Sequence, residues 1–258
     1  MKLKNVLMLT SLLGTLVMVP SPVVWANGGK ASSATTPGQQ TMPISADDLY
    51  GDDDGAQVAD PLEGWNRFWF GFNDLFYDFV LRPVAVGYSA VIPEGGRETV
   101  QDFFSNLTTP VRLVGSVMQG KGERAGNELG RFCINTTLGV LGLFDVAAHQ
   151  YEIRRQDAED MGQALGSYGM GEGLYLVWPI LGPSTARDSL GLVGDYLVNP
   201  MSYYPTDTSD KAAVFGLRLI NETSFRMADY DNVRSASVDP YVAFRHAYVQ
   251  LRREKINK

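Results

Sequence analysis

Hydrophobic side chains recur at helical spacing along much of this chain, and the densest segment covers residues 62–81. Asp60, Pro61 and Glu63 suit a helix start, because aspartate can cap, proline fits the first turn and glutamate can reach back. Pro83 is expected to end the helix. The aromatic residues that recur at helical spacing are Trp65, Phe68, Trp69, Phe72, Phe76 and Phe79.

Aromatic side chains make up eight of the twenty residues in this segment. A helix in the core of a water-soluble protein normally uses aliphatic residues, whereas Trp and Tyr favour the membrane interface. Charged residues such as Arg67, Asp74 and Asp78 exclude a simple membrane-spanning helix. The pattern therefore predicts either a belt at a membrane interface or a buried core helix.

The rest of the pattern predicts a mainly α-helical domain. Helices are expected at 93–107, 110–118, 209–229 and 239–255, with one long helix or a broken pair over 120–148. Residues 174–178 are the best strand, the glycine-rich residues 166–173 predict a flexible hairpin or lip, and Ser184 is expected to cap the next helix. The longest charge-free run after residue 60 has 14 residues and two prolines. Any membrane contact is therefore expected in the plane of the interface or behind an amphipathic wall.

The chain divides into three parts. Lys2 and Lys4 precede an uncharged stretch over residues 5–29 that contains Val-Trp-Ala at 24–26, so residues 1–26 are predicted to be a secretory signal cleaved after Ala26. An uncleaved membrane anchor is the alternative. Residues 27–59 are polar, then acidic, and predict a disordered linker, which leaves 60–258 as a single folded domain.

The composition argues against several classes of function. A net charge of −7 argues against a nucleic-acid partner. With one cysteine and two histidines there is no disulfide framework, and we expect neither a metal site nor a cofactor. Cys133 is interpreted as an inert core thiol, and Asp145 with His149 as a surface contact. No catalytic motif is present, so no catalytic residue is assigned and no enzyme is predicted.

Several blocks in order make the chain resemble the MlaA/VacJ family of outer-membrane lipoproteins. The resemblance covers nearly all of 60–253. The blocks are Asp60-Pro-Leu-Glu-Gly-Trp-Asn-Arg67, Leu81-Arg-Pro-Val-Ala85, Arg131-Phe-Cys-Ile-Asn135 with 139–145, residues 162–173, Gly182-Pro-Ser-Thr-Ala-Arg-Asp188, and Asp239-Pro-Tyr241 with Arg245.

The resemblance implies a ring-shaped helical domain in the inner leaflet of the outer membrane. An amphipathic channel through the ring would remove mislocalised phospholipid from the outer leaflet and pass it to a periplasmic lipid-carrier protein, which keeps the membrane asymmetric. A trimeric porin is the implied neighbour. The alternatives are a periplasmic scaffold that docks on a porin without moving lipid and, third, an enzyme that acts on lipid.

The resemblance also suggests site residues. Gly169 and Gly171 match the family's channel lip. Arg131, Arg187 and Asp188 match family positions, where they would either meet headgroups or brace helices. Family members are typically lipidated on a cysteine just after the signal, and Cys133 is the chain's only cysteine. The protein is therefore expected to be unlipidated and held by its aromatic helices, by a partner or by an uncleaved signal.

Overall fold

The computed structural model describes residues 59–258. The predicted signal and all but the last residue of the predicted linker lie outside the described residues. The elements are α3 (Glu63–Phe76), a π-helical turn η1 (Tyr77–Leu81), α4 (Arg82–Val91), α5 (Glu94–Leu107), α6 (Thr109–Met118), α7 (Gly122–Thr137), α8 (Val146–Gln150), α9 (Met161–Ser167), β1 (Tyr175–Trp178), β2 (Gly182–Thr185), α10 (Ala186–Val198), a 3₁₀ turn η2 (Pro200–Ser202), α11 (Thr208–Ala236) and α12 (Pro240–Asn257).

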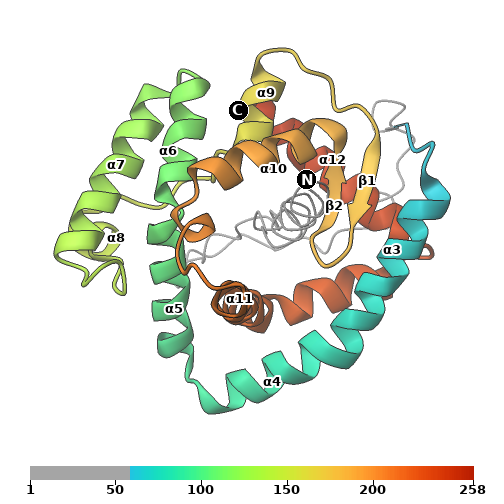
Figure 1. Ribbon diagram of the computed structural model, residues 1–258, viewed down its shortest axis with the longest axis horizontal. Helices are drawn as coiled ribbons and strands as arrows, with labels where there is room; N and C mark the ends of the chain where they lie inside the picture. Colours follow the sequence, from blue (N-terminus) through green and yellow to red (C-terminus); the bar gives the residue numbers. More distant parts are fainter. Residues whose placement is uncertain (1–58) are drawn as a thin grey trace, which may run out of the picture.

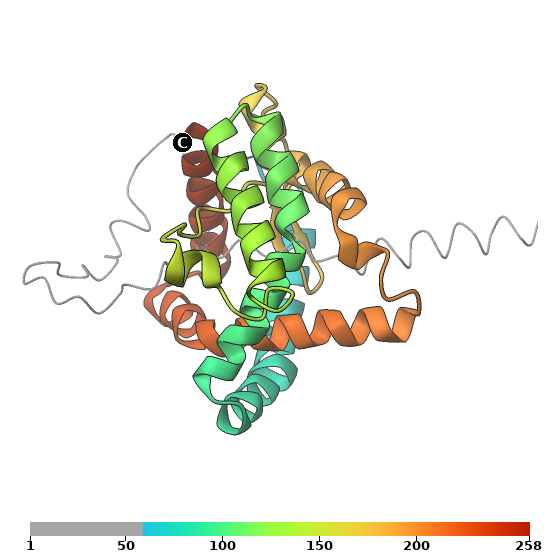
Figure 2. The same cartoon turned by 90° about the vertical axis from the view of Figure 1, so that its left-hand side faces the viewer.

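These elements follow one another around a common centre (Figure 1). Helices α3, α4 and α5 form an outer arc, α6 and α7 lie side by side, and α9, α10 and α12 pack together beside the β1–β2 hairpin. The long helix α11 lies inside the arc, and its first half projects from the body of the molecule (Figure 2). The predicted mainly helical fold is confirmed. An open channel through the ring stays a prediction, because side chains fill gaps between ribbons.

The aromatic helix does not end at Pro83, so that prediction was wrong. The turn η1 widens the helix, and the backbone N–H of Arg82 donates to the Tyr77 carbonyl five residues back. Pro83 then stands in the first turn of α4, where its missing N–H matters least. The aromatic segment therefore continues to Val91 as one curved element.

The β-hairpin is formed by β1 and β2 and not by residues 166–173, where a flexible hairpin or lip was predicted. Strand β1 confirms the strand predicted at 174–178, and it pairs antiparallel with β2, with Tyr175 opposite Thr185 and Trp178 opposite Gly182. Residues 168–174 form a loop before the hairpin. Thr185, rather than the predicted Ser184, caps α10, because its hydroxyl accepts from the N–H of Asp188.

The other predicted helices are confirmed with bounds shifted by at most two residues, except that α11 continues to Ala236, seven residues beyond its predicted end. The segment 120–148 is a broken pair. Helix α7 ends at Thr137, and a turn with Val140 and Leu141 in the left-handed region leads to α8. Near the hairpin, Tyr175, Val177 and Tyr241 form a small apolar cluster.

Candidate functional site

The aromatic surface lies on the outer arc. It consists of exposed apolar side chains on α3, η1 and α4, namely Trp65, Phe68, Phe72, Leu75, Phe79, Val80, Val84, Val86 and Val91. Phe68 is 65% exposed and Phe79 is 76% exposed, which excludes the buried core-helix alternative for this face. Of the predicted belt, Trp69 and Phe76 are partly buried, and the Trp69 ring makes edge contacts with Trp65, Phe68 and Phe72.

Most of the buried residues in the described part of the chain are polar or charged. Twelve hydrophobic residues are buried there, against 22 polar or charged ones. Water-soluble proteins show the reverse, because lysine, glutamate, arginine and aspartate are almost never fully buried unless paired. Helix α10 illustrates the inversion: Arg187, Asp188 and Asp195 are buried, while Leu190 and Leu197 are exposed.

One buried ionic network joins α9, α10 and α12. The Arg252 guanidinium bonds to Asp188 at 2.7 and 3.0 Å and to Asp160 at 2.6 and 3.0 Å. Tyr248 donates to Asp188 at 2.8 Å, and Arg187 Nε donates to the same carboxylate at 3.1 Å. Burial would raise the pKa of Asp160 and of Asp188, but the Arg252 charge and its hydrogen bonds hold both pKa values below their usual range.

Glycines allow this network to form. A Cβ on Gly191 would lie 2.3 Å from the backbone nitrogen of Gly162, so α9 and α10 approach closely only because both residues lack side chains. Arg187 and Asp188 both belong to this network. Arg187 Nη1 also donates to the Met170 carbonyl at 3.5 Å, and Arg187 Nη2 has no partner among the described residues.

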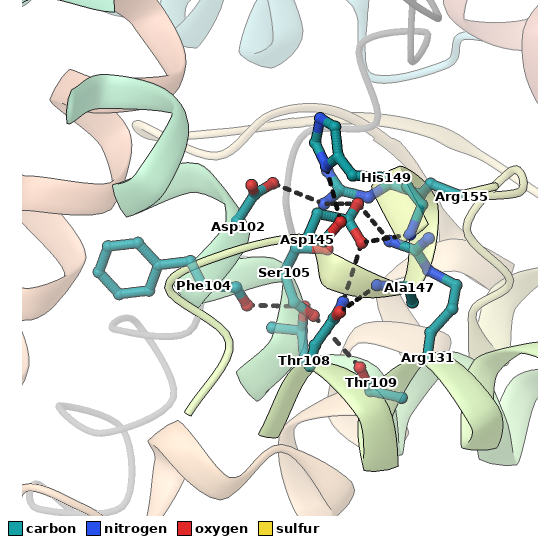
Figure 3. Close-up of polar contacts among 12 residues, drawn as sticks. Asp102, Phe104, Ser105, Thr108, Thr109, Arg131, Asp145, Ala147, His149 and Arg155 are labelled. Carbon is teal, nitrogen blue, oxygen red and sulfur yellow. Dashed lines mark hydrogen bonds and ion pairs between the residues drawn. The ribbon is translucent and has the colours of Figure 1, made fainter. Parts of the chain in front are cut away.

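Arg131 belongs to a second network, between α7 and α8 (Figure 3). Arg131 Nη2 donates to Asp145 at 2.6 Å, and its Nη1 bonds to the Ile153 carbonyl. Asp145 also accepts from Asn135 at 3.0 Å and caps α8. Burial would raise the pKa of Asp145, but Arg131 holds that pKa below its usual value. His149 contacts the backbone carbonyl of Asp145 rather than its carboxylate, so the predicted pairing of these side chains was wrong.

Gly169 and Gly171 lie in the loop between α9 and β1. Gly169 has φ of 89°, which favours glycine, and an added Cβ at either position would meet nothing within 4 Å. The loop is held from α12, because Arg253 Nε donates to Glu172 at 2.8 Å. Arg252 and Arg253, at the basic end of α12, are therefore engaged in ion pairs within the protein.

The sequence reasoning missed the residues that dock the hairpin on α3. Asn66 donates to the Tyr175 carbonyl at 2.9 Å and accepts from the Val177 N–H at 2.8 Å. Asn73, two turns later, donates to the Trp178 carbonyl at 2.9 Å and accepts from the Ile180 N–H at 2.6 Å. The sequence offered one signal for this contact, which is the presence of two asparagines seven residues apart in an aromatic helix.

Asp60 has a different role from the predicted cap. Its carboxylate accepts from Asn66 at 2.7 Å and from Arg245 at 2.9 Å, and it bonds to Tyr241. It therefore joins the start of α3 to α12. Cys133 is exposed on α7, so its interpretation as a core thiol was wrong.

Within residues 59–258, no group of three or more histidine, cysteine, aspartate or glutamate side chains could hold a metal ion. Over the same residues, no single helix is long and apolar enough to cross a membrane. The bent pair formed by Glu63–Val91 and Glu94–Leu107, with 117° between its parts, passes that test by length and composition.

These features define a mainly helical protein with ionic networks inside and aromatic side chains outside. Residues 58–255 match the model of the MlaA lipoprotein family, and the chain belongs to this family. It is 34% identical over 195 residues to the intermembrane phospholipid transport system lipoprotein MlaA of Escherichia coli, covering 74% of this chain and 76% of the relative. The corresponding Haemophilus influenzae protein is 30% identical over 199 residues, covering 77% and 79%.

An uncharacterized Rickettsia typhi protein is 35% identical to this chain over 201 residues, and the match covers 78% of this chain and 79% of the Rickettsia protein. A solved structure from work on the structural basis for maintenance of bacterial outer membrane lipid asymmetry gives a TM-score of 0.66 at 34% identity. The match covers 78% of this chain and 100% of the chain in the solved structure.

Proposed function

We propose that this protein is the outer-membrane component of a phospholipid transport system, which removes mislocalised phospholipid from the outer leaflet and keeps the membrane asymmetric. The observation that carries the proposal is the inverted distribution of side chains. The aromatic surface faces outward, and charged groups such as Arg131, Arg187 and Asp188 are buried in ionic networks. This arrangement suits an apolar surrounding, because aromatic rings favour the lipid interface and paired charges tolerate burial.

A phospholipid needs two kinds of surface along its path. Its acyl chains need apolar contacts, and its phosphate needs donors, since an unpaired charge away from water is costly. The chain supplies both within one domain and supplies no recognisable catalytic group, which supports transport rather than lipid chemistry. Relatives named as parts of an intermembrane phospholipid transport system support the same function.

The finer parts of the proposal concern partners and attachment. A trimeric porin would be the neighbour in the membrane, and a periplasmic carrier would receive the lipid. The relatives are named lipoproteins, which is at odds with the expectation of an unlipidated protein. Intact-mass measurement of the protein purified from outer membranes decides this point, because an acylated cysteine adds the mass of its chains.

Deletion of the gene tests the proposed function. Outer-leaflet phospholipid should rise in the deletion strain and return to normal when the full chain is expressed again. A deletion strain with normal outer-leaflet phospholipid would refute transport.

The porin-docking scaffold is separated from transport at the glycine-rich loop. Gly169→Val and Gly171→Val restrict the backbone there, and valine at position 169 also disfavours the positive φ, while the first added carbon meets no neighbouring atom at either position. We expect the double variant to stop lipid clearance while still co-purifying with a porin. Normal clearance by a folded double variant would show that these glycines are not a moving lip.

A further inference from the structure

Arg187 is a buried cation whose hydrogen bonds are incomplete. Its side chain is only 3% exposed. Nε donates to Asp188 at 3.1 Å, Nη1 reaches the Met170 carbonyl at 3.5 Å, and the buried Nη2 has no partner among the described residues. A buried donor without an acceptor is costly, and the planar fork of an arginine matches a carboxylate or a phosphate with two parallel bonds. Arg187 therefore has donors left for an anionic partner.

Asp188 is shared between two arginines and a tyrosine. Arg252 donates to both of its carboxylate oxygens, at 2.7 and 3.0 Å, and Tyr248 donates at 2.8 Å. Arg187 reaches the same carboxylate through Nε alone, at the longer distance of 3.1 Å. Arg252 is therefore the main partner of Asp188, and Arg187 is the less completely bonded of the two arginines.

The glycine-rich loop between α9 and β1 lies against Arg187. Besides the contact with Met170, the backbone N–H of Arg187 donates to the Glu172 carbonyl at 3.2 Å. A Cβ added to Gly166, near the end of α9, would lie 3.3 Å from Nη1. Residues 168–171 are exposed, whereas Arg187 is buried. The loop therefore lies between this guanidinium group and solvent.

The loop is held at its ends and has free space around its middle. At one end the Tyr168 hydroxyl donates to a backbone carbonyl of α6, and at the other Glu172 accepts from Arg253 Nε at 2.8 Å. Between them, a Cβ added to Gly169 or Gly171 would meet nothing within 4 Å. Glycine also adopts more backbone conformations than other residues do. The middle of the loop therefore has the space and the backbone freedom to move away from Arg187.

We propose that Arg187 binds the phosphate of a phospholipid headgroup when the middle of this loop moves away. The inference rests on the proposed function and names the residue that receives the headgroup. Nη1 exchanges its long contact with the Met170 carbonyl for a phosphate oxygen, and Nη2 gains an acceptor. Arg131 differs, because its Nη1 and Nη2 already bond to the Ile153 carbonyl and to Asp145.

The test uses the purified full chain in an uncharged detergent, titrated with short-chain phosphatidylglycerol in a calorimeter. Arg187→Gln should bind this lipid about tenfold more weakly, since a charged hydrogen-bond partner is lost. Arg187→Lys, which keeps the charge but not the fork, should retain part of the affinity. Arg154→Gln is the control, because it removes the same charge from an exposed position, and it should bind as the unmodified chain does.

A lipid without a phosphate separates headgroup binding from a purely structural role. Short-chain diacylglycerol should bind equally to the unmodified chain and to Arg187→Gln. If Arg187 only braced the helices, its loss would weaken the binding of both lipids to the same extent. An equal loss for the two lipids would therefore overturn the proposal.

Glu172→Gln gives a test in the opposite direction and leaves Arg187 in place. It weakens the ion pair with Arg253 that holds one end of the loop, so the open loop is more populated and phosphatidylglycerol should bind more tightly. Amide exchange at Arg187, whose N–H bonds to the loop, should also accelerate. Glu63→Gln breaks an exposed pair on α3 and should change neither quantity.

The loop variant keeps the proposal testable if Arg187→Gln does not fold, which circular dichroism would reveal. Unchanged or weaker phosphatidylglycerol binding by folded Glu172→Gln would overturn the proposal, as would equal affinity in the unmodified chain and folded Arg187→Gln. Inorganic phosphate that binds as tightly as phosphatidylglycerol would also overturn it, because the site would then hold a free anion.

Expression in the deletion strain separates this inference from the proposed function. Arg187→Gln should fail to restore normal outer-leaflet phospholipid. Normal lipid clearance by Arg187→Gln alongside a defective deletion strain would overturn the headgroup site alone. A deletion strain without a defect would overturn the proposed function itself.

Discussion

Asp188 illustrates how much a single buried residue contributes to the stability of this protein. It accepts hydrogen bonds from Arg187, Tyr248 and Arg252, and its side chain is 5% exposed. A buried charge with partners of this kind is costly to disturb, because its loss leaves Arg252 without half of its compensation. Residues on the surface, such as the pair of Glu63 with Arg67, have far less influence.

Asp188→Asn should therefore lower the free energy of unfolding by about 3–5 kcal/mol. Denaturant titration followed by circular dichroism measures the change. Glu63→Gln breaks an exposed pair and should cost less than about 1 kcal/mol. A similar small cost for both variants would mean that the network is not a brace.

The same network predicts a dependence of stability on pH. Folding lowers the pKa of Asp160 and of Asp188, so the folded state binds fewer protons than the unfolded state in acid. The stabilisation is complete above the unfolded pKa of about 3.9 and is lost as pH falls through the lower folded pKa values. Melting temperatures measured from neutral pH down to about pH 2 should fall in this window. The fall should be shallower in Asp188→Asn, and an unchanged slope would contradict the assignment.

At the scale of elements, the hairpin depends on α3 as much as on its own strands. Asn66 and Asn73 each bond to one carbonyl and one N–H of β1 and the turn that follows it, so two amide groups fix the position of the hairpin. The pair is visible in the sequence as two polar positions in an aromatic helix. Its partners are 109 and 105 residues away, so local pattern could not reveal them.

Asn73→Ala should loosen the tip of the hairpin. It removes the partner of the Trp178 carbonyl and of the Ile180 N–H, both of which are exposed to solvent, at a cost of about 0.5–1.5 kcal/mol. Amide hydrogen exchange should accelerate at Ile180 while β1 near Asn66 stays protected. Asn232→Ala, at an exposed position on α11, serves as the control and should leave exchange unchanged.

At the scale of the whole molecule, the inverted distribution of side chains predicts behaviour at membranes. Phe68→Asp places a charge on the aromatic surface without disturbing a buried contact, because Phe68 is 65% exposed. We expect the fraction of protein that floats with phospholipid vesicles to fall several-fold, since a buried apolar ring contributes about 1.5–3 kcal/mol. Asn232→Asp adds the same charge at an exposed polar position and should float as the unmodified chain does.

The sequence by itself determined the helical class, the aromatic segment, most helix positions and the family. These follow from local spacing and from motifs within short blocks. It also limited the roles of Arg187 and Asp188 to bracing or headgroup contact. It misplaced the hairpin, the end of the aromatic helix and the environment of Cys133, because each depends on packing with distant segments.

Only the tertiary structure decided which charged side chains form ion pairs with each other inside the protein. Arg252 meets Asp188 across 64 residues and Asp160 across 92, and such pairs leave no trace in local pattern. The fold places the paired cations in networks between helices. The physical reason is that spacing along the chain sets which face a residue occupies, whereas its electrostatic partner is set by the helix that folds against that face.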